Sequence, residues 1–554
     1  MLFNNDLQLL LYEGKIQMKS TKDNYELELL YQLKDIVPRS AYGPNSTMFA
    51  IALEGWRRGL QLKFYTKLIK NRVKIRYALA SEEKEIPFQL SLAEIVPKKA
   101  RRITRSKADT KEVLIRNKVS TPQGGSFNEK DTDTDIMEYA QNLGYPLIIK
   151  PTNASLGIGV ITDIQNKDML EEALKELRGR MGYKEIILEQ EVTGDDTRLF
   201  VIGDEVFSAF KRIAPNVTGN GKDTIKELIS DKNDERKNHP HMNGSRIPIN
   251  DDVIEHLAKQ NLTLDSILEE GKNITLDTHT FPSNGAEIAE VTEELTEEDR
   301  KLAVQAAKTL PGLTVCGVDI MIDREKDTRY VLELNSRPNI IGSLFPWVGT
   351  PKNIAKAIVD FYFPESLEET KRREGDNFYF DFDEISRILK AGIAKEIIVP
   401  PLTKKEIIMK KLIVTGKVQG VGFRKWVQRT ATGFALNGFV KNLKNGNVQI
   451  VIAGTSQNVN KFIENVETKK SKKIRVEKVR VTKWDNPVKA AFEIKTSTGN
   501  IDKLKKELSK VKNRNNELET KLKKTQQKLS WMEKSKSWRL TLPARKLLKT
   551  MKRN

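Results

Sequence analysis

The chain has 554 residues, of which 95 are Lys or Arg and 75 are Asp or Glu, so its formal net charge is +20. A chain of this length requires several domains. Its single cysteine excludes a disulfide framework and favours a reducing compartment. The apolar run at residues 7–12 is too short for a membrane span and follows Asp6 rather than a basic segment. We therefore expect a multidomain cytoplasmic protein.

Residues 1–105 are expected to form a small α/β domain. Within it, residues 48–60 have the apolar spacing of an amphipathic helix. Met18 is an alternative to Met1 as the first residue of the protein.

Residues 145–160, YPLIIKPTNASLGIGV, predict a loop that holds a polyphosphate. The apolar run at 146–149 suits a short strand, so Lys150 would lie at the strand end as a charge for phosphate. Gly157 and Gly159 lack a Cβ, which lets backbone N–H groups close on phosphate oxygens. An ordinary strand and loop with a surface lysine explains this segment equally well when it is taken alone.

Other short motifs in this half carry no chemistry of their own. GNGKDT at 219–224 lacks both the P-loop spacing and the Ser or Thr that follows its lysine. The four histidines do not form a zinc pattern with Cys316. We expect HPH at 239–241 to be an exposed loop.

Residues 318–323 and 331–338 predict two apolar-alternating strands that carry acids. Strand side chains alternate, so Glu333 and Asn335 share one face, which Asp319 can join from a neighbouring antiparallel strand. Hard oxygen ligands of this kind suit Mg²⁺, which completes its coordination with phosphate oxygens and water. Two strand carboxylates are by themselves more often a solvated face, but here they follow a phosphate-type loop.

The series of segments resembles the ATP-grasp superfamily of ADP-forming carboxylate–amine ligases, especially the cyanophycin synthetase and bifunctional glutathione synthetase type. The resemblance covers residues 106–365. Besides the stretches above, it includes the segments at 106–122, 186–206, 216–229 and 257–276.

This resemblance implies ATP and Mg²⁺ as cofactors, with Mn²⁺ as an alternative. In the implied reaction a carboxylate attacks the γ-phosphoryl group of ATP, and an amine then displaces phosphate to form an amide. The matching positions are Lys107, Lys150, Ser155, Gly157 and Gly159 for the phosphates, Glu189, Gln190 and Val192 for adenine, Asp196 for ribose, Asp319, Glu333 and Asn335 for the metal, and Arg212 and Arg337 for the transferring phosphate or the substrate carboxylate.

The chain departs from this family at residues 276–286, LDTHTFPSNGA, where the relatives carry a pattern like LRxNANLSTGG. Asp277 stands in place of the arginine, and His279 and Phe281 stand in place of the paired asparagines. In the family this segment lies near the acyl acceptor, so the resemblance leaves the substrate open. Asn220, in place of an aspartate, is a mild change.

Residues 408–497 read as a second domain of βαββαβ order, with the last strand near residues 491–495. GKVQGVGFR at 416–424 and GFVKN at 438–442 resemble both signature motifs of acylphosphatases. The resemblance implies that Arg424 and the loop amides cradle a phosphoryl group while Asn442 orients the attacking water. The domain is thus either catalytic, with editing of stray acyl phosphates as one role, or an anion-binding module.

The C-terminal part is basic. Residues 401–554 hold 39 Lys or Arg and 11 Asp or Glu, a net charge of +28, whereas residues 1–400 carry −8.

Ten residues from 501 to 532 follow a heptad with Asn515 at an a position, which predicts a parallel homodimer; a single solvated helix is the alternative. The basic tail at 534–554 suggests contact with an anionic membrane surface or a polyanionic polymer, and its piece SWRLTLPAR resembles tails of bacterial polysaccharide glycosyltransferases. Nucleic acid ranks last as a partner because no nucleic-acid motif accompanies the charge.

We therefore predict an α/β and α+β multidomain protein with an ATP-grasp fold, a ferredoxin-like acylphosphatase domain and a C-terminal coiled coil. Its favoured function is amide ligation with fused acylphosphatase activity in bacterial cell-envelope synthesis, peripheral to the membrane. The alternative is a non-catalytic nucleotide-binding assembly protein. The expected segments are 1–105 (N-terminal domain), 106–365 (ATP-grasp), 366–407 (linker), 408–497 (acylphosphatase-like), 500–533 (coiled coil) and 534–554 (tail).

Overall fold

The computed structural model describes residues 30, 33–154, 158–280, 284–367, 378–402, 406–469 and 473–495, with residues 514, 518, 522, 525 and 526. The chain divides into two compact units, Met1–Lys404 and Lys405–Asn554. The five isolated residues are helical. The rest of the predicted coiled coil, Asn515 included, and the whole basic tail lie outside the described residues. Among the described helices, none is long and apolar enough to cross a membrane.

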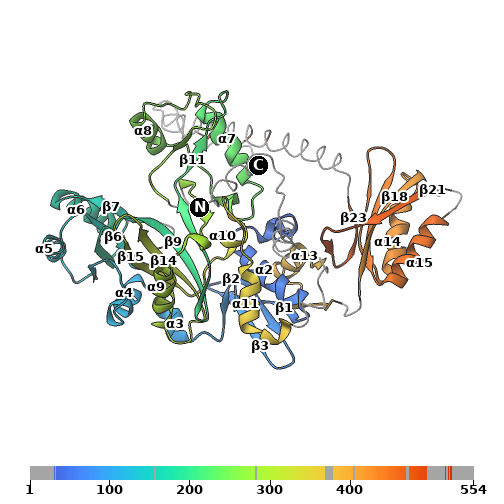
Figure 1. Ribbon diagram of the computed structural model, residues 1–554, viewed down its shortest axis with the longest axis horizontal. Coiled ribbons are helices and arrows are strands. Elements are labelled where there is room, and N and C mark those ends of the chain that lie inside the picture. The colour runs from blue at the N-terminus through green and yellow to red at the C-terminus, as the bar shows by residue number, and fades with distance from the viewer. Residues whose placement is uncertain are drawn as a thin grey trace, which may run out of the picture. The chain divides into compact units, whose positions relative to one another are not determined.

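The first unit opens with a five-stranded sheet of order β17-β1-β2-β3-β4 (Figure 1). Helix α2 packs on it, and its residues are buried on nearly all sides rather than on one face as predicted. The elements are η2 (Arg39–Ala41), α2 (Asn45–Arg57), β1 (Gln61–Ile69), β2 (Arg72–Ala80), β3 (Glu85–Gln89), β4 (Leu92–Ala93), β16 (Phe378–Tyr379), α13 (Phe382–Lys390) and β17 (Glu396–Val399).

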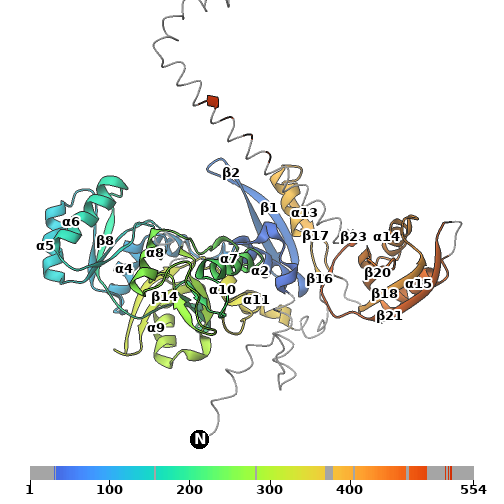
Figure 2. The same ribbon diagram turned by 90° about the horizontal axis from the view of Figure 1, so that it is seen from above.

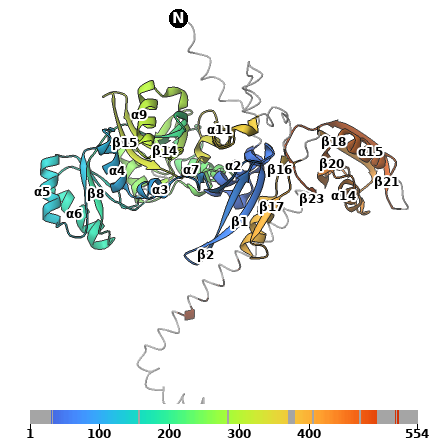
Figure 3. The same cartoon turned by 90° about the horizontal axis from the view of Figure 1, so that it is seen from below.

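Residues 378–402, which we expected to belong to a linker, instead complete this sheet. Strand β17 pairs antiparallel with β1, and α13 lies beside the same sheet (Figures 2 and 3). The ring of Phe380 lies 5.3 Å from that of Phe49 and 5.5 Å from that of Phe64. Trp56 Nε1 donates to Pro400 O at 2.8 Å. The apolar aromatic residues of this segment are therefore core residues, which its many charges hide in the sequence.

Next comes a four-stranded sheet of order β5-β8-β6-β7, covered by α5 and α6 over one apolar core. Helices α3 and α4 lead into it. The elements are α3 (Lys98–Ile103), α4 (Lys107–Arg116), β5 (Gly124–Phe127), α5 (Asp133–Leu143), β6 (Leu147–Pro151), β7 (Ile161–Ile164), α6 (Lys167–Leu174), the π-helical turn η3 (Lys175–Arg180) and β8 (Ile186–Gln190).

The central sheet of the unit is antiparallel throughout, with order β13-β10-β9-β14-β15, and α9 packs across it. In its register Asp319 lies opposite both Glu333 and Arg198. The elements are β9 (Asp195–Ile202), β10 (Glu205–Ile213), β13 (Glu287–Glu290), η6 (Thr292–Glu294), α9 (Glu297–Lys308), β14 (Val315–Asp323), β15 (Thr328–Asn335), α10 (Ile341–Leu344), α11 (Ile354–Tyr362) and η7 (Pro364–Ser366).

A small lobe with its own apolar core separates β10 from β13. It contains β11 (Asn216–Thr218), α7 (Ile225–Arg236), η4 (Met242–Gly244), α8 (Asp251–Lys259) and β12 (Asn273–Thr275). The prediction that residues 239–241 form an exposed loop is wrong. His239 and Pro240 are buried, because the His239 ring packs edge-on to Trp347 at 5.6 Å and its Nδ1 accepts the Met242 N–H at 3.2 Å.

The second unit contains a sheet of order β21-β18-β20-β19-β23 over one core shared with α14 and α15 (Figure 1). Its first four strands and two helices follow the predicted ferredoxin-like βαββαβ order, but the fourth strand is β21. The segment near 491–495 is a fifth strand, parallel to β19. The elements are β18 (Ile408–Lys417), α14 (Phe423–Gly433), β19 (Asn437–Asn442), β20 (Val448–Gly454), α15 (Ser456–Glu467), β21 (Arg475–Lys483), β22 (Val488–Lys489) and β23 (Phe492–Lys495).

Candidate active sites

Two lysines from different elements meet one buried carboxylate in the first unit. Lys150 lies near the end of β6, and its Nζ contacts Oε2 of Glu189 on the neighbouring strand β8. Lys111 Nζ lies 2.8 Å from the other oxygen, Oε1. Lys111 is one turn beyond Lys107 on α4, a helix whose start is fixed by the Ser106 hydroxyl cap. The group carries a net positive charge close to the predicted phosphate loop.

Burial and charge oppose each other within this group. Burial alone would raise the pKa of Glu189, but the charges of Lys150 and Lys111 outweigh it and the pKa is lowered. Burial also lowers the pKa of Lys111, although Glu189 counteracts it. One carboxylate thus contacts two ammonium groups, and its single negative charge neutralises only one of their two positive charges. Such a surplus suits an anionic ligand.

The predicted metal ligands come together on adjacent strands of the central sheet. Asp319 receives two hydrogen bonds from Arg198, at 2.5 Å from Nε and 2.6 Å from Nη2. Glu333 Oε2 lies 2.8 Å from Lys107 Nζ. The Asn335 amide joins the two acids, because its nitrogen can donate to Glu333 Oε1 at 3.1 Å while its oxygen accepts from Arg198 at 3.2 Å. Each acid therefore has a cationic partner at this cluster.

Arg212 on β10 adds a further cation. Its Nη1 lies 2.5 Å from Asp196 Oδ1 and its Nη2 lies 3.8 Å from Asp319 Oδ2. Burial raises the pKa of Asp196, which Arg212 offsets only in part. Burial would do the same to Asp319, but Arg198 lowers the pKa of that acid. Asp196 thus lies among the metal-ligand candidates, and its predicted contact with ribose stays a prediction.

His241 lies near this cluster although it was not among the predicted site residues. Burial, and then the charge of Arg212, lower the pKa of His241 to about 4, so its imidazole is neutral at pH 7. Its Nδ1 is buried and has no hydrogen-bond partner among the described residues. A neutral ring beside Arg212 can accept a hydrogen bond from a substrate N–H or O–H group.

The donor set fits Mg²⁺. Within the described part of the chain, no group of three or more His, Cys, Asp and Glu side chains is arranged to hold a metal ion. Mg²⁺ does not require such a group, because it binds through one or two carboxylates and takes substrate phosphate oxygens and waters for the rest. Asp319 and Glu333 would supply the carboxylates, and Asn335 an amide oxygen.

The other predicted nucleotide contacts are placed less completely. Ser155 and Gly157 lie outside the described residues. Gly159 has φ +72°, and a Cβ there would lie 2.9 Å from Pro151 Cγ, so this turn requires glycine. The Gln190 side chain donates to Leu143 O at 2.8 Å, which ties it to the end of α5. Val192 is half-buried.

The altered segment after β12 is held by its own aspartate. Asp277 is 7% exposed. It accepts hydrogen bonds from the His279 N–H at 3.0 Å and from Asn284 Nδ2 at 2.8 Å. Phe281 lies outside the described residues. The acid that replaces the family's arginine thus stabilises its own turn.

Sequence reasoning missed Lys111 and Arg198. Each had a local signal, since Lys111 follows Lys107 by four residues on one helix face. Arg198 follows Asp196 by two residues on one strand face. Neither spacing predicted which acid the cation contacts, because Glu189 and Asp319 come from other strands.

The second unit brings its two signature motifs to one end of the sheet. Gln419, in the turn before α14, donates to Leu443 O at 2.9 Å and to Asn447 O at 2.7 Å, which holds that turn against the end of β19. Arg424, the second residue of α14, is half-buried, and no described carboxylate pairs with it. The Asn442 Oδ1 atom is buried without a hydrogen-bond partner among the described residues. A free guanidinium group and a free amide oxygen suit a phosphoryl group and a water molecule.

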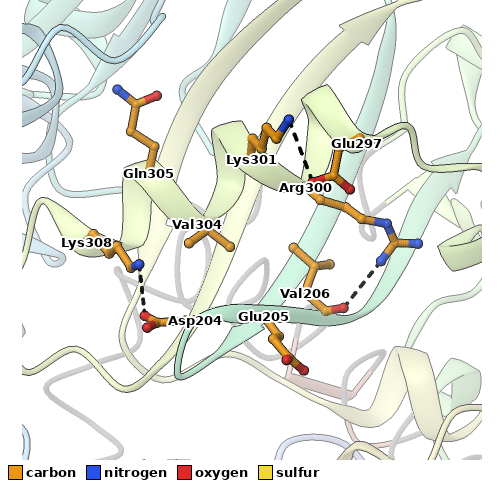
Figure 4. A pocket seen from close by; sticks show the side chains of 9 residues that line it. All are labelled: Asp204, Glu205, Val206, Glu297, Arg300, Lys301, Val304, Gln305 and Lys308. Carbon is orange, nitrogen blue, oxygen red and sulfur yellow. Dashed lines mark hydrogen bonds and ion pairs between the residues drawn. The ribbon is translucent and has the colours of Figure 1, made fainter.

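A separate hollow lies between α9 and the turn that joins β9 to β10 (Figure 4). Its two lysines are already paired, with Lys308 Nζ 3.2 Å from Asp204 Oδ1 and Lys301 Nζ 3.9 Å from Glu297 Oε1. No predicted site residue lines it, so we assign no ligand to it. Its lining residues are Asp204, Glu205, Val206, Glu297, Arg300, Lys301, Val304, Gln305 and Lys308.

Comparison with known protein families identifies both predicted domains. Residues 104–228 and 279–361 match the RimK-like ATP-grasp domain, and residues 410–494 match the acylphosphatase family. The chain therefore carries a RimK-like ATP-grasp domain followed by an acylphosphatase domain. ATP-grasp ligases use ATP and Mg²⁺. The ATP-grasp match omits residues 229–278, which include most of α7, His241, α8 and β12.

Individual relatives resemble the ATP-grasp half. The glutathione biosynthesis bifunctional protein GshAB of Listeria monocytogenes is 31% identical over 264 residues, 47% of this chain and 34% of the relative. A cyanophycin synthetase of Geminocystis herdmanii is 27% identical over 375 residues, 64% of this chain and 41% of the relative. A bifunctional glutathione synthetase structure from Pasteurella multocida has 24% identity and a TM-score of 0.42 over 55% of this chain and 42% of its own. The chain spans about a third of the length of the GshAB relative.

Proposed function

We propose that this protein joins a carboxylate to an amine with conversion of ATP to ADP, through an acyl phosphate, and that its C-terminal domain hydrolyses acyl phosphates. The observation that carries the first part is the convergence of Lys107, Arg198 and Arg212 on the predicted ligands Asp319 and Glu333. Phosphoryl transfer needs positioning and charge stabilisation more than covalent help from the protein, which is what such a cluster offers.

The side chains would take different roles according to the groups that they contact. Lys150, with Lys111 beside it, would bind ATP phosphates, since the pair exceeds the charge of Glu189. Lys107 is 2.8 Å from Glu333, so the same ammonium group can shift to a phosphate oxygen once Glu333 has another partner. Arg212 would stabilise charge on the transferring phosphoryl group. Mg²⁺ bound by Asp319, Glu333 and Asn335 would supply further charge neutralisation.

In the second step the amine is the nucleophile, so it must be uncharged and must lie near the acyl group. His241 is uncharged at neutral pH and has a free nitrogen beside Arg212. Its free nitrogen would orient the amine by accepting a hydrogen bond from one of the amine N–H groups. The carboxylate of Asp277 would not compete for this amine, since its hydrogen bonds remain within its own turn.

In the second unit, Arg424 would bind the phosphoryl oxygens and Asn442 would orient water for attack on phosphorus. The buried free oxygen of Asn442 supports this assignment, because an unsatisfied buried acceptor is costly unless a ligand or water occupies it. Catalysis is thereby favoured over a purely anion-binding module.

The charged cluster around Asp319 and Glu333 disfavours the rival role, that of a nucleotide-binding assembly protein. A protein that only recruits partners has no need of three acids, an amide and three cations gathered in one cluster. The cell-envelope role rests on the coiled coil and tail, which lie outside the described residues apart from five helical positions.

The test is ADP release from MgATP in the full-length protein, screened over amino acids, dipeptides and uronic-acid polymers. At least one acid should give ADP release that an amine accelerates, and Lys150→Met should abolish it. The matched control is Lys184→Met, which removes an exposed lysine paired with Glu129 at 2.8 Å and should leave the rate unchanged. Equal rates in the two variants, or no ADP release with any acid, would overturn the ligase assignment.

A further inference from the structure

Three arginines come from separate elements near the loop that follows β15, and the charges of two of them act on the third. Arg76 lies on β2 of the N-terminal sheet, Arg105 in the turn between α3 and α4, and Arg337 two residues beyond the end of β15. Two hydrogen bonds tie the loop of Arg337 to the turn of Arg105 and to the β3–β4 turn of the N-terminal sheet. Thr104 and Ser336 share one at 2.7 Å between their hydroxyl oxygens, and the Ser91 hydroxyl donates to Pro338 O at 2.6 Å.

These three side chains lack the acid partners that several other arginines of the protein have. The buried Arg58 and Arg236 and the half-buried Arg198 each contact a carboxylate within 2.7 Å. By contrast, among the described residues no carboxylate lies within ion-pair distance of any of the three. Arg76 is 7% exposed, yet its only described hydrogen bond goes to the backbone oxygen of its neighbour Ile75, at 3.1 Å.

Glu94 is an acid that could neutralise Arg76, but it already has another partner. Glu94 acts on Arg76 over a longer range, but its carboxylate pairs with Lys67 at 2.7 Å. The charges of Arg76 and Arg105 both act on Arg337, and the side chains of Arg105 and Arg337 are exposed. Gathering three guanidinium groups without an anion costs free energy, because like charges repel and one of them has lost most of its water.

We infer that Arg76, Arg105 and Arg337 bind a second anionic group of the acid substrate, which is therefore a multiply charged oxyanion such as a di- or tricarboxylate. The inference rests on the proposed ligase function. Arg337 follows the metal-ligand candidate Asn335 by two residues, a span of at most about 7 Å of chain. A substrate of ordinary metabolite size can thus present one carboxylate to ATP and another to the three arginines, whose planar forks suit oxyanions.

The inference also gives the N-terminal domain a task. Arg76 comes from a sheet outside both segments that match the ATP-grasp family. Substrate selection would then depend on a strand that the ATP-grasp fold itself does not supply.

The test measures binding of tricarballylate to the full-length protein by calorimetry, with a saturating non-hydrolysable ATP analogue and Mg²⁺ present. Butyrate, with one carboxylate, is the ligand control, and inorganic phosphate distinguishes a phosphate site from a carboxylate site. The variants are Arg105→Gln, which changes an exposed residue and should fold normally, and Arg76→Gln. Arg102→Gln is the matched control, since it also removes an exposed arginine, one on α3 that is not among the charges acting on Arg337.

Tricarballylate should bind wild type and Arg102→Gln equally, and about 10-fold more weakly to Arg105→Gln and Arg76→Gln, while butyrate binds none of them measurably. Tighter binding of phosphate than of tricarballylate would reassign the three arginines to a phosphorylated substrate and overturn the carboxylate claim. Equal affinity of Arg102→Gln and Arg105→Gln, or no binding to wild type, would overturn the site itself. Binding of the ATP analogue, measured alone, distinguishes these results from failure of the ligase assignment.

Discussion

Replacing Glu189 by Gln should destabilise the first unit strongly while increasing the stabilisation that MgATP provides. Glu189 is the shared partner of Lys111 and Lys150, and the three side chains are only 6%, 6% and 11% exposed. Glutamine keeps the shape of the side chain but removes its charge. Two ammonium groups then face each other in a buried position, with no described carboxylate left between them.

The size of the effect follows from burial. Removing one partner of a buried ion pair costs about 3–5 kcal/mol, because the remaining charge is uncompensated. The first unit has 404 residues. At about 2.1 cal/mol/K per residue, its unfolding entropy is on the order of 0.85 kcal/mol/K, so the melting midpoint should fall by about 4–6 °C. A double variant with Lys111→Met should recover part of this loss, since one surplus charge is removed with the acid.

Differential scanning calorimetry with and without MgATP measures both effects, and Glu129→Gln is the control. Glu129 and Lys184 also lie 2.8 Å apart, but their side chains are 60% and 74% exposed, so this substitution should leave the midpoint unchanged. MgATP should raise the midpoint of Glu189→Gln more than that of wild type, because phosphate replaces the lost carboxylate. Equal midpoints for the two single variants would refute the argument from burial.

The pH dependence has a definite sign. The pKa of Glu189 is lower in the folded protein than the unfolded value of about 4.3. Its contribution to stability is therefore fully present above that value and is lost as the pH falls through the folded pKa. The difference between wild type and Glu189→Gln should be constant from about pH 6 to 8 and should shrink below about pH 4.

Three further predictions concern the metal, the second domain and assembly. Glu333→Ala should abolish ADP production but leave the fold intact, because a hard ligand for Mg²⁺ is lost; wild-type turnover would contradict the metal assignment. Arg424→Ala should reduce hydrolysis of benzoyl phosphate by about 100-fold; if the domain edits, wild type should also consume more ATP per amide on a poor substrate than this variant, and equal stoichiometry would remove the editing role. Residues 501–532 should make the protein a parallel dimer, and Asn515→Ile should tighten the helices while loosening the choice of oligomer, as light scattering would show; a monomer at micromolar concentration would contradict the heptad reading.

Local patterns were sufficient to predict how the candidate metal ligands of the ATP-grasp strands are placed. Glu333 and Asn335 are two residues apart, and the period of a strand places them on one face regardless of the rest of the fold. The same holds for Lys150 at the end of a short apolar strand. The prediction for residues 239–241 failed for the complementary reason: polar residues next to a proline suggest a surface loop, but Trp347, a hundred residues further on, covers them.

The amino-acid sequence by itself determined the two recognisable domains, the order of their motifs and the candidate side chains for binding phosphate, because these depend on residue type and short-range spacing. The tertiary structure alone decided which charges meet. Glu189 between Lys111 and Lys150, Arg198 on Asp319, and Arg76 beside Arg337 each join elements that lie far apart in the chain. Strand order and register set these contacts, and neither is encoded in the local spacing of any one segment. The return of residues 378–402 to the N-terminal sheet has the same origin, since a strand of four residues has no local signature strong enough to name its distant partner β1.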